Sequence, residues 1–299
     1  MARYFNNEWA PARIEFPGNF IMGRDRYCLL TFLDSVRMPP PMPLPIILHH
    51  GLFGYDSVGV GKFRWAYFQG IDKALRRAGY PVLVSKVHPT GGIAKRASQL
   101  KESIEEGMAE LNGSGHGKMI LVAHSMGGLD ARYMIHKLGM EDRVAALLTI
   151  TTPHRGSPYA DWCVRHIGKR LGGFELMNKL GLDVTGIRDL TTDACATFNE
   201  KITDVTGVDY FSVSAAREWP KVAPFVLHSH KVVADAEGEN DGIVSVKSSK
   251  WGTHLGTWRA DHFHTINKRY VLEFRNRTGN IAPYYVKAVG QVLAALHAK

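Results

Sequence analysis

The chain has 299 residues, 45% of them hydrophobic and 22% charged, which suits one large globular domain. The net charge is +9, but Lys and Arg are dispersed and have no aromatic platform beside them, which disfavours a nucleic-acid-binding protein. No apolar run approaches the ~18 residues of a transmembrane segment. Residues 1–7 lack the apolar core of a signal peptide, so the protein is expected in the cytoplasm, or outside the cell if a presequence is missing.

Apolar runs and amphipathic stretches alternate along the chain. In the longest amphipathic stretch, Leu100, Ile104, Met108 and Leu111 recur at helical spacing. The proline-rich stretch 39–45 predicts an extended connector. Strands are predicted at 13–16, 27–32, 45–50, 81–87, 119–122, 144–150 and 210–214. Helices are predicted at 68–78, 100–111, 129–135 and 284–297.

This alternation predicts an α/β fold: one domain over residues 1–299, with a mostly parallel sheet covered by helices on both faces. The alternation of predicted strands and helices ends after Ser157. Residues 158–205 predict several short helices, which form either a lid over a site or additional structural helices.

One strand-to-helix junction carries a candidate nucleophile. Ser125 lies in Ala123-His124-Ser125-Met126-Gly127-Gly128, after a strand and before a helix. Small residues on both sides leave room for the tight turn of a nucleophile elbow, which exposes a strained serine. Ala123 stands where Gly is usual, and the alternative is an ordinary turn with a surface serine.

Five blocks together resemble the bacterial true lipases, triacylglycerol lipases of the α/β-hydrolase superfamily. The resemblance covers most of residues 45–270 and leaves the N-terminal 40 residues unmatched. The blocks are His50-Gly51-Leu52-Phe53-Gly54, Ala123-His124-Ser125-Met126-Gly127-Gly128, Thr152-Pro153-His154-Arg155-Gly156-Ser157, Asn240-Asp241-Gly242-Ile243-Val244 and Asp261-His262-Phe263.

The resemblance implies a role for each site residue. Ser125 would be the nucleophile, His262 the general base and Asp241 the acid that orients the imidazole. The backbone N–H groups of Leu52 and Met126 would form the oxyanion hole.

Some of these residues have rivals or a second interpretation. His254 and His264 lie close to His262 in the sequence, and Asp241 fits an ordinary turn. Trp65, Tyr67 and Phe68 either line an acyl pocket or belong to the core. The structural residues are expected to be His49 and His50 under the oxyanion loop, His124 in the core, and His154 and Arg155 at a turn.

No cofactor is expected. The resemblance implies a structural calcium ion bound partly by an Asp two residues after the catalytic histidine, but His264 stands there, which disfavours that site. The cysteine pair of the relatives also has no counterpart. Cys28, Cys163 and Cys195 are few and widely spaced, which argues against a disulfide framework but allows one bridge.

The resulting hypothesis is a serine ester hydrolase that forms an acyl-enzyme, acting as a lipase on acylglycerols or other lipid esters at an oil–water interface. The alternatives are a short-chain carboxylesterase, and an acyltransferase or polyester depolymerase with the same triad. A non-catalytic binding protein would require a broken triad, which this sequence does not have.

Overall fold

The computed structural model describes residues 43–299 except 55–56, 61–62, 113–116, 169–182 and 269–278, and it describes only the backbone of 57–60, 63–65, 112 and 167–168. The strands predicted at 13–16 and 27–32, the start of the proline-rich stretch and Cys28 therefore lie outside the described residues. Residues 43–299 cluster as one compact unit.

A six-stranded sheet, parallel throughout, forms the centre of this unit, which confirms the predicted fold class. In spatial order the strands are β4 (Val82–Val84), β1 (Ile46–His49), β5 (Met119–His124), β6 (Val144–Ile150), β7 (Asp209–Ala215) and β8 (Thr253–Trp258). β5 and β6 lie in the middle and every residue in them is buried, as expected for parallel strands covered on both faces.

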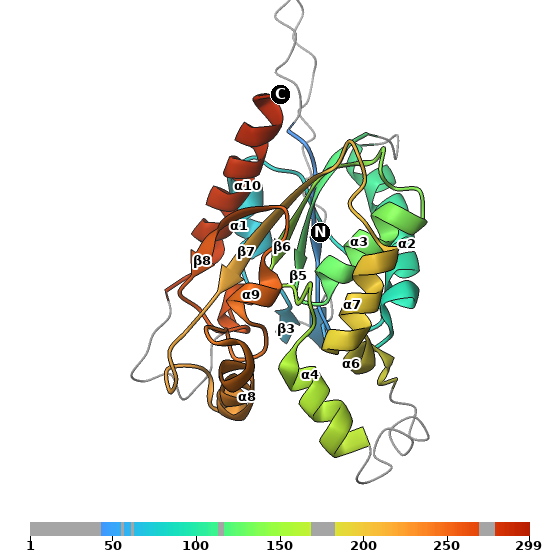
Figure 1. Cartoon of the computed structure of the whole chain (residues 1–299). Helices are drawn as coiled ribbons and strands as arrows, with labels where there is room; N and C mark the ends of the chain where they lie inside the picture. The colour runs from blue at the N-terminus through green and yellow to red at the C-terminus, as the bar shows by residue number, and fades with distance from the viewer. Residues whose placement is uncertain (1–42, 55–56, 61–62, 113–116, 169–182, 269–278) are drawn as a thin grey trace, which may run out of the picture. The chain divides into compact units, whose positions relative to one another are not determined.

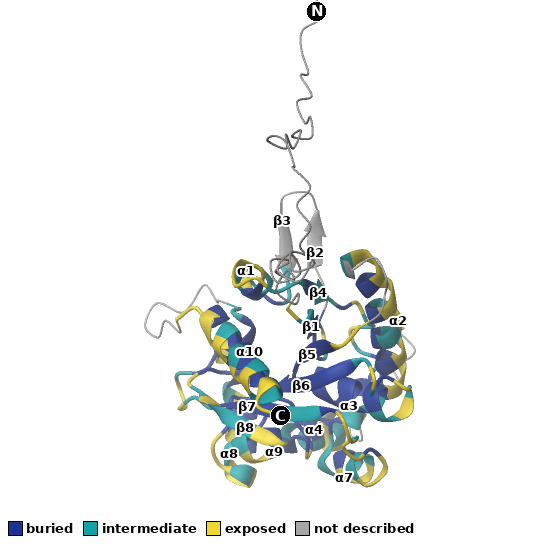
Figure 2. Cartoon of the chain, turned by 90° about the horizontal axis from the view of Figure 1, so that it is seen from above, coloured by how far each residue is buried: buried dark blue, intermediate teal, exposed yellow. Residues whose placement is uncertain are grey.

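Helices cover both faces of the sheet (Figure 1). α1 (Ile71–Arg77) and α10 (Ala282–His297) pack on one face, and α2 (Ile93–Asn112) and α3 (Gly127–Lys137) pack on the other. α1, α2 and α10 each turn a buried side inward and an exposed side to solvent, whereas α3 is almost wholly buried (Figure 2).

The alternation of side chains along each strand feeds two separate cores. In β1, Ile46 and Leu48 join the core beneath α1 and α10, while Ile47 joins the core beneath α2 and α3. All three are fully buried, and burying a side chain of this size stabilises the fold by ~1.5–3 kcal/mol.

The remaining elements are short. They are the antiparallel pair β2 (Ser57–Val60) and β3 (Phe63–Ala66), then α4 (Pro158–Cys163), the π-helical turn η1 (Val164–Gly168), α6 (Thr185–Asp189), α7 (Thr192–Lys201), η2 (Pro224–Val226), α8 (Leu227–Glu237), α9 (Val246–Ser249) and η3 (His264–Ile266). The described part of 158–205 thus consists of short helices, as predicted. Within the described residues, no helix has both the length and the apolar character needed to cross a bilayer.

The parallel sheet also determines where a site can form. Leu52 follows β1, Ser125 follows β5 and His262 follows β8, so all three lie beyond the carboxyl ends of their strands. In open α/β sheets this edge is where ligands bind.

Candidate active site

Ser125 occupies a strained turn between β5 and α3. Its φ is 55°, a left-handed conformation that a non-glycine residue adopts only when its surroundings enforce it. Its N–H donates to the Ile150 carbonyl at 2.9 Å, which fixes the turn to β6.

Three glycines let the chain pass close to this turn. A Cβ on Gly51 would lie 2.7 Å from the Ser125 Cβ, and one on Gly127 would lie 2.8 Å from the His50 carbonyl oxygen. A Cβ on Gly128 would lie only 2.2 Å from the Thr152 hydroxyl oxygen. The sequence pattern of small residues therefore has a steric cause.

The structure brings His262 to Ser125. His262 lies 137 positions further along the chain, yet its Nε2 is 2.9 Å from the Ser125 Oγ. The two residues keep 6% and 7% of their surfaces exposed, enough for a small reacting group to reach the hydroxyl. The 2.9 Å between the His262 Nε2 and the Ser125 Oγ is a hydrogen-bond distance, which a nucleophile and its general base require.

Asp241 lies on the far side of the imidazole. Its Oδ2 is 2.7 Å from the His262 Nδ1, and its Oδ1 accepts N–H groups from Ile243 at 2.9 Å and Val244 at 2.8 Å. The His262 N–H also donates to the Asp241 carbonyl at 2.8 Å. The carboxylate is fully buried and both oxygens are occupied, so it holds one orientation of the ring.

The rival histidines have other partners. His254 Nε2 lies 2.9 Å from the Ser214 hydroxyl, and His264 pairs with Asp261 at 2.7 Å. Burial alone would raise the pKa of Asp261, but hydrogen bonds from His264 and from backbone N–H groups lower it below its usual value. Of the three candidates, His262 is therefore the one beside Ser125.

The two predicted oxyanion donors lie beside the nucleophile. Leu52 follows Gly51, which packs against Ser125, and Met126 is the next residue in the chain. Within the described part of the chain, neither backbone N–H donates to a protein acceptor. With respect to the described residues, both are therefore available to donate to a substrate oxygen.

A buried polar cluster supports the oxyanion loop, as predicted for His49 and His50. Arg96 donates to the His50 carbonyl at 2.7 Å and to Asp130 at 2.8 Å, and His49 bridges Asp130 and Ser85. Burial lowers the pKa of His49, and it lowers that of His50 to about 3. Both rings are therefore neutral at pH 7.

The other predicted structural residues also have structural contacts. His124 is buried between Tyr67 and Thr265. The His154 N–H donates to the Ser248 carbonyl at 3.1 Å. Arg155 donates to the carbonyls of Lys247 and Lys250, which ties the turn after β6 to α9.

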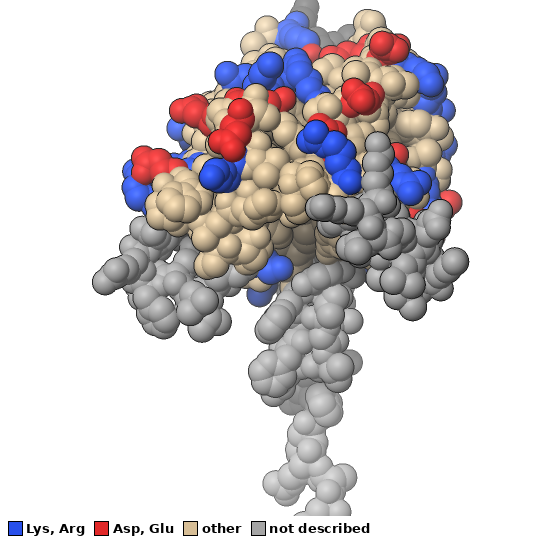
Figure 3. Space-filling view, turned by 60° about the horizontal axis from the view of Figure 1, so that its bottom comes forward, with Lys and Arg blue, Asp and Glu red and all other residues tan. Residues whose placement is uncertain are grey.

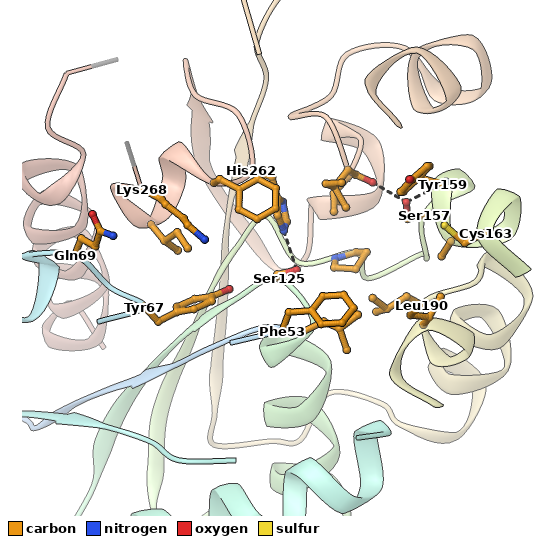
Figure 4. Close-up of a pocket in the computed structure, with 18 of the residues that line it drawn as sticks. Phe53, Tyr67, Gln69, Ser125, Ser157, Tyr159, Cys163, Leu190, His262 and Lys268 are labelled. Carbon is orange, nitrogen blue, oxygen red and sulfur yellow. Dashed lines mark hydrogen bonds between the residues drawn. The ribbon is translucent and has the colours of Figure 1, made fainter. Parts of the chain in front are cut away.

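A pocket of about 260 Å³ opens over Ser125 (Figure 4). Of the three aromatic candidates, Tyr67 lines it, Phe68 belongs to the core, and the Trp65 side chain is outside the described residues. The lining is mostly apolar: Leu52, Phe53, Ala66, Pro153, Ala160, Cys163, Ile187, Leu190, Ile243, Val244, Phe263 and Ile266. Sequence reasoning did not single out two polar lining residues, Gln69 and Lys268.

The described residues do not fit a metal centre. They contain no group of three or more His, Cys, Asp or Glu side chains placed to hold an ion. At the position implied for a calcium ligand, the imidazole of His264 pairs with Asp261, and an imidazole is a poor substitute for the oxygen ligands that Ca²⁺ prefers. Cys163 and Cys195 are free thiols.

Comparison with known proteins agrees with this geometry. The PGAP1-like alpha/beta domain family matches residues 90–223. Triacylglycerol lipase 2 of Saccharomyces cerevisiae is 33% identical, over 81% of this chain and 86% of its own length. A triacylglycerol lipase of Vibrio cholerae is 29% identical, over 75% of this chain and 79% of its own length.

Solved structures share the fold. The lipase BlEst2 of Bacillus licheniformis superposes with a TM-score of 0.60 at 24% identity, covering 78% of this chain and 90% of that one. The metagenomic carboxyl esterase MGS0156 superposes with a TM-score of 0.69 at 19% identity, covering 87% of this chain and 80% of that one. With the sequence match to the yeast enzyme, these findings show that the chain belongs to the triacylglycerol lipase family of the α/β-hydrolase superfamily.

Proposed function

We propose that the protein hydrolyses acylglycerols or other lipid esters, with Ser125, His262 and Asp241 as its catalytic triad. The observation that carries this proposal is the continuous hydrogen-bonded chain from the Ser125 hydroxyl through the His262 ring to the Asp241 carboxylate. A strained, partly exposed serine at one end of such a chain is the arrangement of an activated nucleophile.

Acylation begins when the Ser125 oxygen attacks the ester carbonyl carbon. The His262 Nε2 takes the hydroxyl proton, and Asp241 stabilises the imidazolium that forms. The carbonyl oxygen becomes negative and accepts hydrogen bonds from the N–H groups of Leu52 and Met126. When the tetrahedral intermediate collapses, His262 returns the proton to the departing alcohol oxygen and the acyl group stays on Ser125.

Deacylation repeats these steps with water. His262 takes a proton from the water molecule as its oxygen attacks the acyl carbon, and the proton then passes to the Ser125 oxygen. The products are a fatty acid and a regenerated hydroxyl. We propose that the reaction needs no cofactor, because residues of the chain supply every proton transfer.

The chemistry of the pocket supports a lipid acyl group as substrate. Its apolar lining gives up little hydration when an alkyl chain enters, and each methylene removed from water contributes ~0.8 kcal/mol. The relatives named as triacylglycerol lipases support the same substrate class. Part of the pocket wall comes from Tyr159, Ala160 and Cys163 of α4 and from Ile187 of α6, which supports a lid role for residues 158–205.

Hydrolysis of p-nitrophenyl esters from acetate to palmitate, by wild type and Ser125→Ala, tests the proposal. Ser98→Ala is a matched control, because Ser98 is exposed on α2 and its hydroxyl donates to the Ala94 carbonyl one turn earlier. We expect the rate to rise with chain length in wild type and Ser98→Ala. In Ser125→Ala it should fall by about 10⁴-fold or more.

Two results would count against this assignment. Substantial turnover in purified, folded Ser125→Ala would remove Ser125 from the mechanism. Activity confined to acetate and butyrate would make the protein a short-chain esterase instead of a lipase.

A further inference from the structure

The pocket has two unlike ends, with Ser125 between them (Figure 4). Tyr159, Cys163 and Leu190 lie on one side of the serine, and Gln69 and Lys268 lie on the other. The first end is mostly apolar, and its Ser157 hydroxyl already donates to the Ile243 carbonyl, so this end suits an acyl chain. The second presents a carboxamide and an ammonium group, which an alkyl chain would leave without partners.

Lys268 is the one Lys, Arg, Asp or Glu among the described residues that line the pocket. Its side chain is half-buried, and its nitrogen points toward the middle of the pocket (Figure 4). The Lys268 nitrogen lies over the Phe263 ring, 5.7 Å from its centroid. Over the part of the chain that the structure describes, no carboxylate forms an ion pair with it. A partly desolvated cation that has no carboxylate partner among the described residues attracts an anion.

The backbone holds Gln69 and Lys268 in a fixed relation. Asn267 adopts φ 64°, and its side-chain amide donates to the Gln69 carbonyl at 2.7 Å and to Asn280 at 3.0 Å. The Gln69 N–H donates to the Ile266 carbonyl at 3.3 Å. Hydrogen bonds with Asn267 and Ile266 thus hold Gln69 next to Lys268, which lies 199 positions further along the chain. Such preorganisation lowers the entropy cost of binding a polar group.

We propose that Lys268, with Gln69 beside it, is an anion subsite that selects esters with a negative charge on the alcohol portion. This inference rests on the proposed ester hydrolysis. The acyl chain lies toward Tyr159 and Leu190, and the leaving alcohol extends toward Lys268. The ammonium group pairs with the anion, and the carboxamide offers a second donor.

The anion can be a phosphate, as in a lysophospholipid, or a carboxylate, as in an ester of a hydroxy acid. Both have oxygens that accept charge-assisted hydrogen bonds from an ammonium group. A neutral acylglycerol makes no such contact, so it would be hydrolysed with lower kcat/KM.

The test uses three lauroyl esters, each kept below its micelle concentration. They are 1-lauroylglycerol, 1-lauroylglycerol 3-phosphate and 3-(lauroyloxy)propanoate, and release of lauric acid is measured. We expect kcat/KM in wild type to be about tenfold higher for at least one charged ester than for the neutral one. This ratio should shrink as salt is added, because ions screen the attraction.

Variants then assign the effect to Lys268. In Lys268→Gln the charged-to-neutral ratio should fall about tenfold. In Lys231→Gln, which alters an exposed lysine of α8, it should keep its wild-type value. In Lys268→Glu the preference should reverse, so that the cationic ester lauroylcholine outperforms the anionic esters. A preference for one anionic ester alone supports the subsite and identifies the anion.

Different results would contradict the anion subsite and the proposed ester hydrolysis. If wild type hydrolyses 1-lauroylglycerol but shows no preference for either charged ester, the anion subsite is overturned and the ester hydrolase stands. An unchanged ratio in Lys268→Gln also overturns the subsite. If wild type hydrolyses none of the esters, the proposed function itself falls.

Discussion

The Tyr67 hydroxyl lies 2.8 Å from the Nδ1 of His124, the residue directly before the candidate nucleophile. Burial lowers the pKa of His124 well below its usual value, so the ring is neutral. Thr265 donates its hydroxyl hydrogen to the His262 carbonyl, so it accepts the Nε2–H of His124 and leaves Nδ1 to accept from Tyr67. The Tyr67 oxygen in turn accepts the Gly51 N–H at 3.2 Å. One directed chain of hydrogen bonds thus joins the loop after β1, which contains Gly51, to the loop after β8, which contains His262.

Removing the Tyr67 hydroxyl should therefore slow the chemistry without weakening substrate binding. In Tyr67→Phe the ring still lines the pocket, but the Gly51 N–H and the His124 ring each lose a partner. We expect kcat on p-nitrophenyl laurate to fall about tenfold with KM nearly unchanged. Tyr80→Phe, which alters a half-buried tyrosine packed against the core near α1, is the matched control. A change in KM alone would contradict a positioning role.

Asp241→Asn tests the orientation of His262. An Asn at this place no longer accepts the Nδ1–H with a charged oxygen and does not stabilise the imidazolium. We expect kcat to fall by about 10⁴-fold while the far-UV circular dichroism spectrum stays the same. Asp193→Asn, at an exposed position in the first turn of α7, should keep full activity. Near wild-type kcat in Asp241→Asn would show that another acid holds the ring.

Gly128→Ala should destabilise the fold by overpacking. The new methyl group would lie 2.2 Å from the Thr152 hydroxyl oxygen, which bonds to the Ser125 carbonyl at 2.7 Å. We expect the free energy of unfolding in urea to fall by about 1–3 kcal/mol. Gly290→Ala is the opposite control, because a Cβ there meets open space on α10 and should stabilise the helix by up to ~1 kcal/mol. Equal stability of the two variants would exclude the steric argument.

Buried neutral histidines make stability depend on pH. Burial, together with the charges of Arg132 and Arg155, lowers the pKa of His154 well below its usual 6.5. Below pH 6.5 the unfolded chain therefore binds a proton at this residue that the folded chain does not bind. Stability is full above pH 6.5 and falls as the pH drops, by up to ~1.4 kcal/mol per pH unit from this residue.

His154→Gln should remove that contribution. Urea unfolding at pH 7.5, 6.5, 5.5 and 5.0 should show a shallower loss of stability toward acid in the variant than in wild type. Parallel curves for the two proteins would show that His154 already takes up a proton in the folded state.

The sequence predicted the parts of the fold that lie in the apolar core. The run of β6 was predicted to the residue, and β5 was predicted because its residues are apolar on both faces. The edge strand β8 was missed because its half-exposed sequence includes Gly256 and has no apolar run. The helix predicted from Phe68 begins only at Ile71, because Gly70 has φ 74° and Phe68 turns into the core.

The candidate site likewise contains residues that the sequence could predict and residues that it could not. The motifs around Ser125, Asp241 and His262 identified three residues that the fold brings together, and their catalytic roles await the variants above. Lys268 and Gln69 have no motif. Their proximity depends on the left-handed conformation of Asn267 and on bonds across 198 positions of sequence, neither of which a local pattern reveals.

The pocket wall and the reacting groups come from different parts of the chain. The wall on the proposed acyl side comes from α4 and α6, while Ser125 and His262 lie on loops that follow strands of the central sheet. Substitutions at Tyr159, Cys163 or Ile187 leave the hydrogen bonds of the triad untouched. A directed-evolution library confined to these three positions therefore samples chain-length preference while the hydrolytic machinery stays constant, so new substrate ranges can arise in few mutational steps.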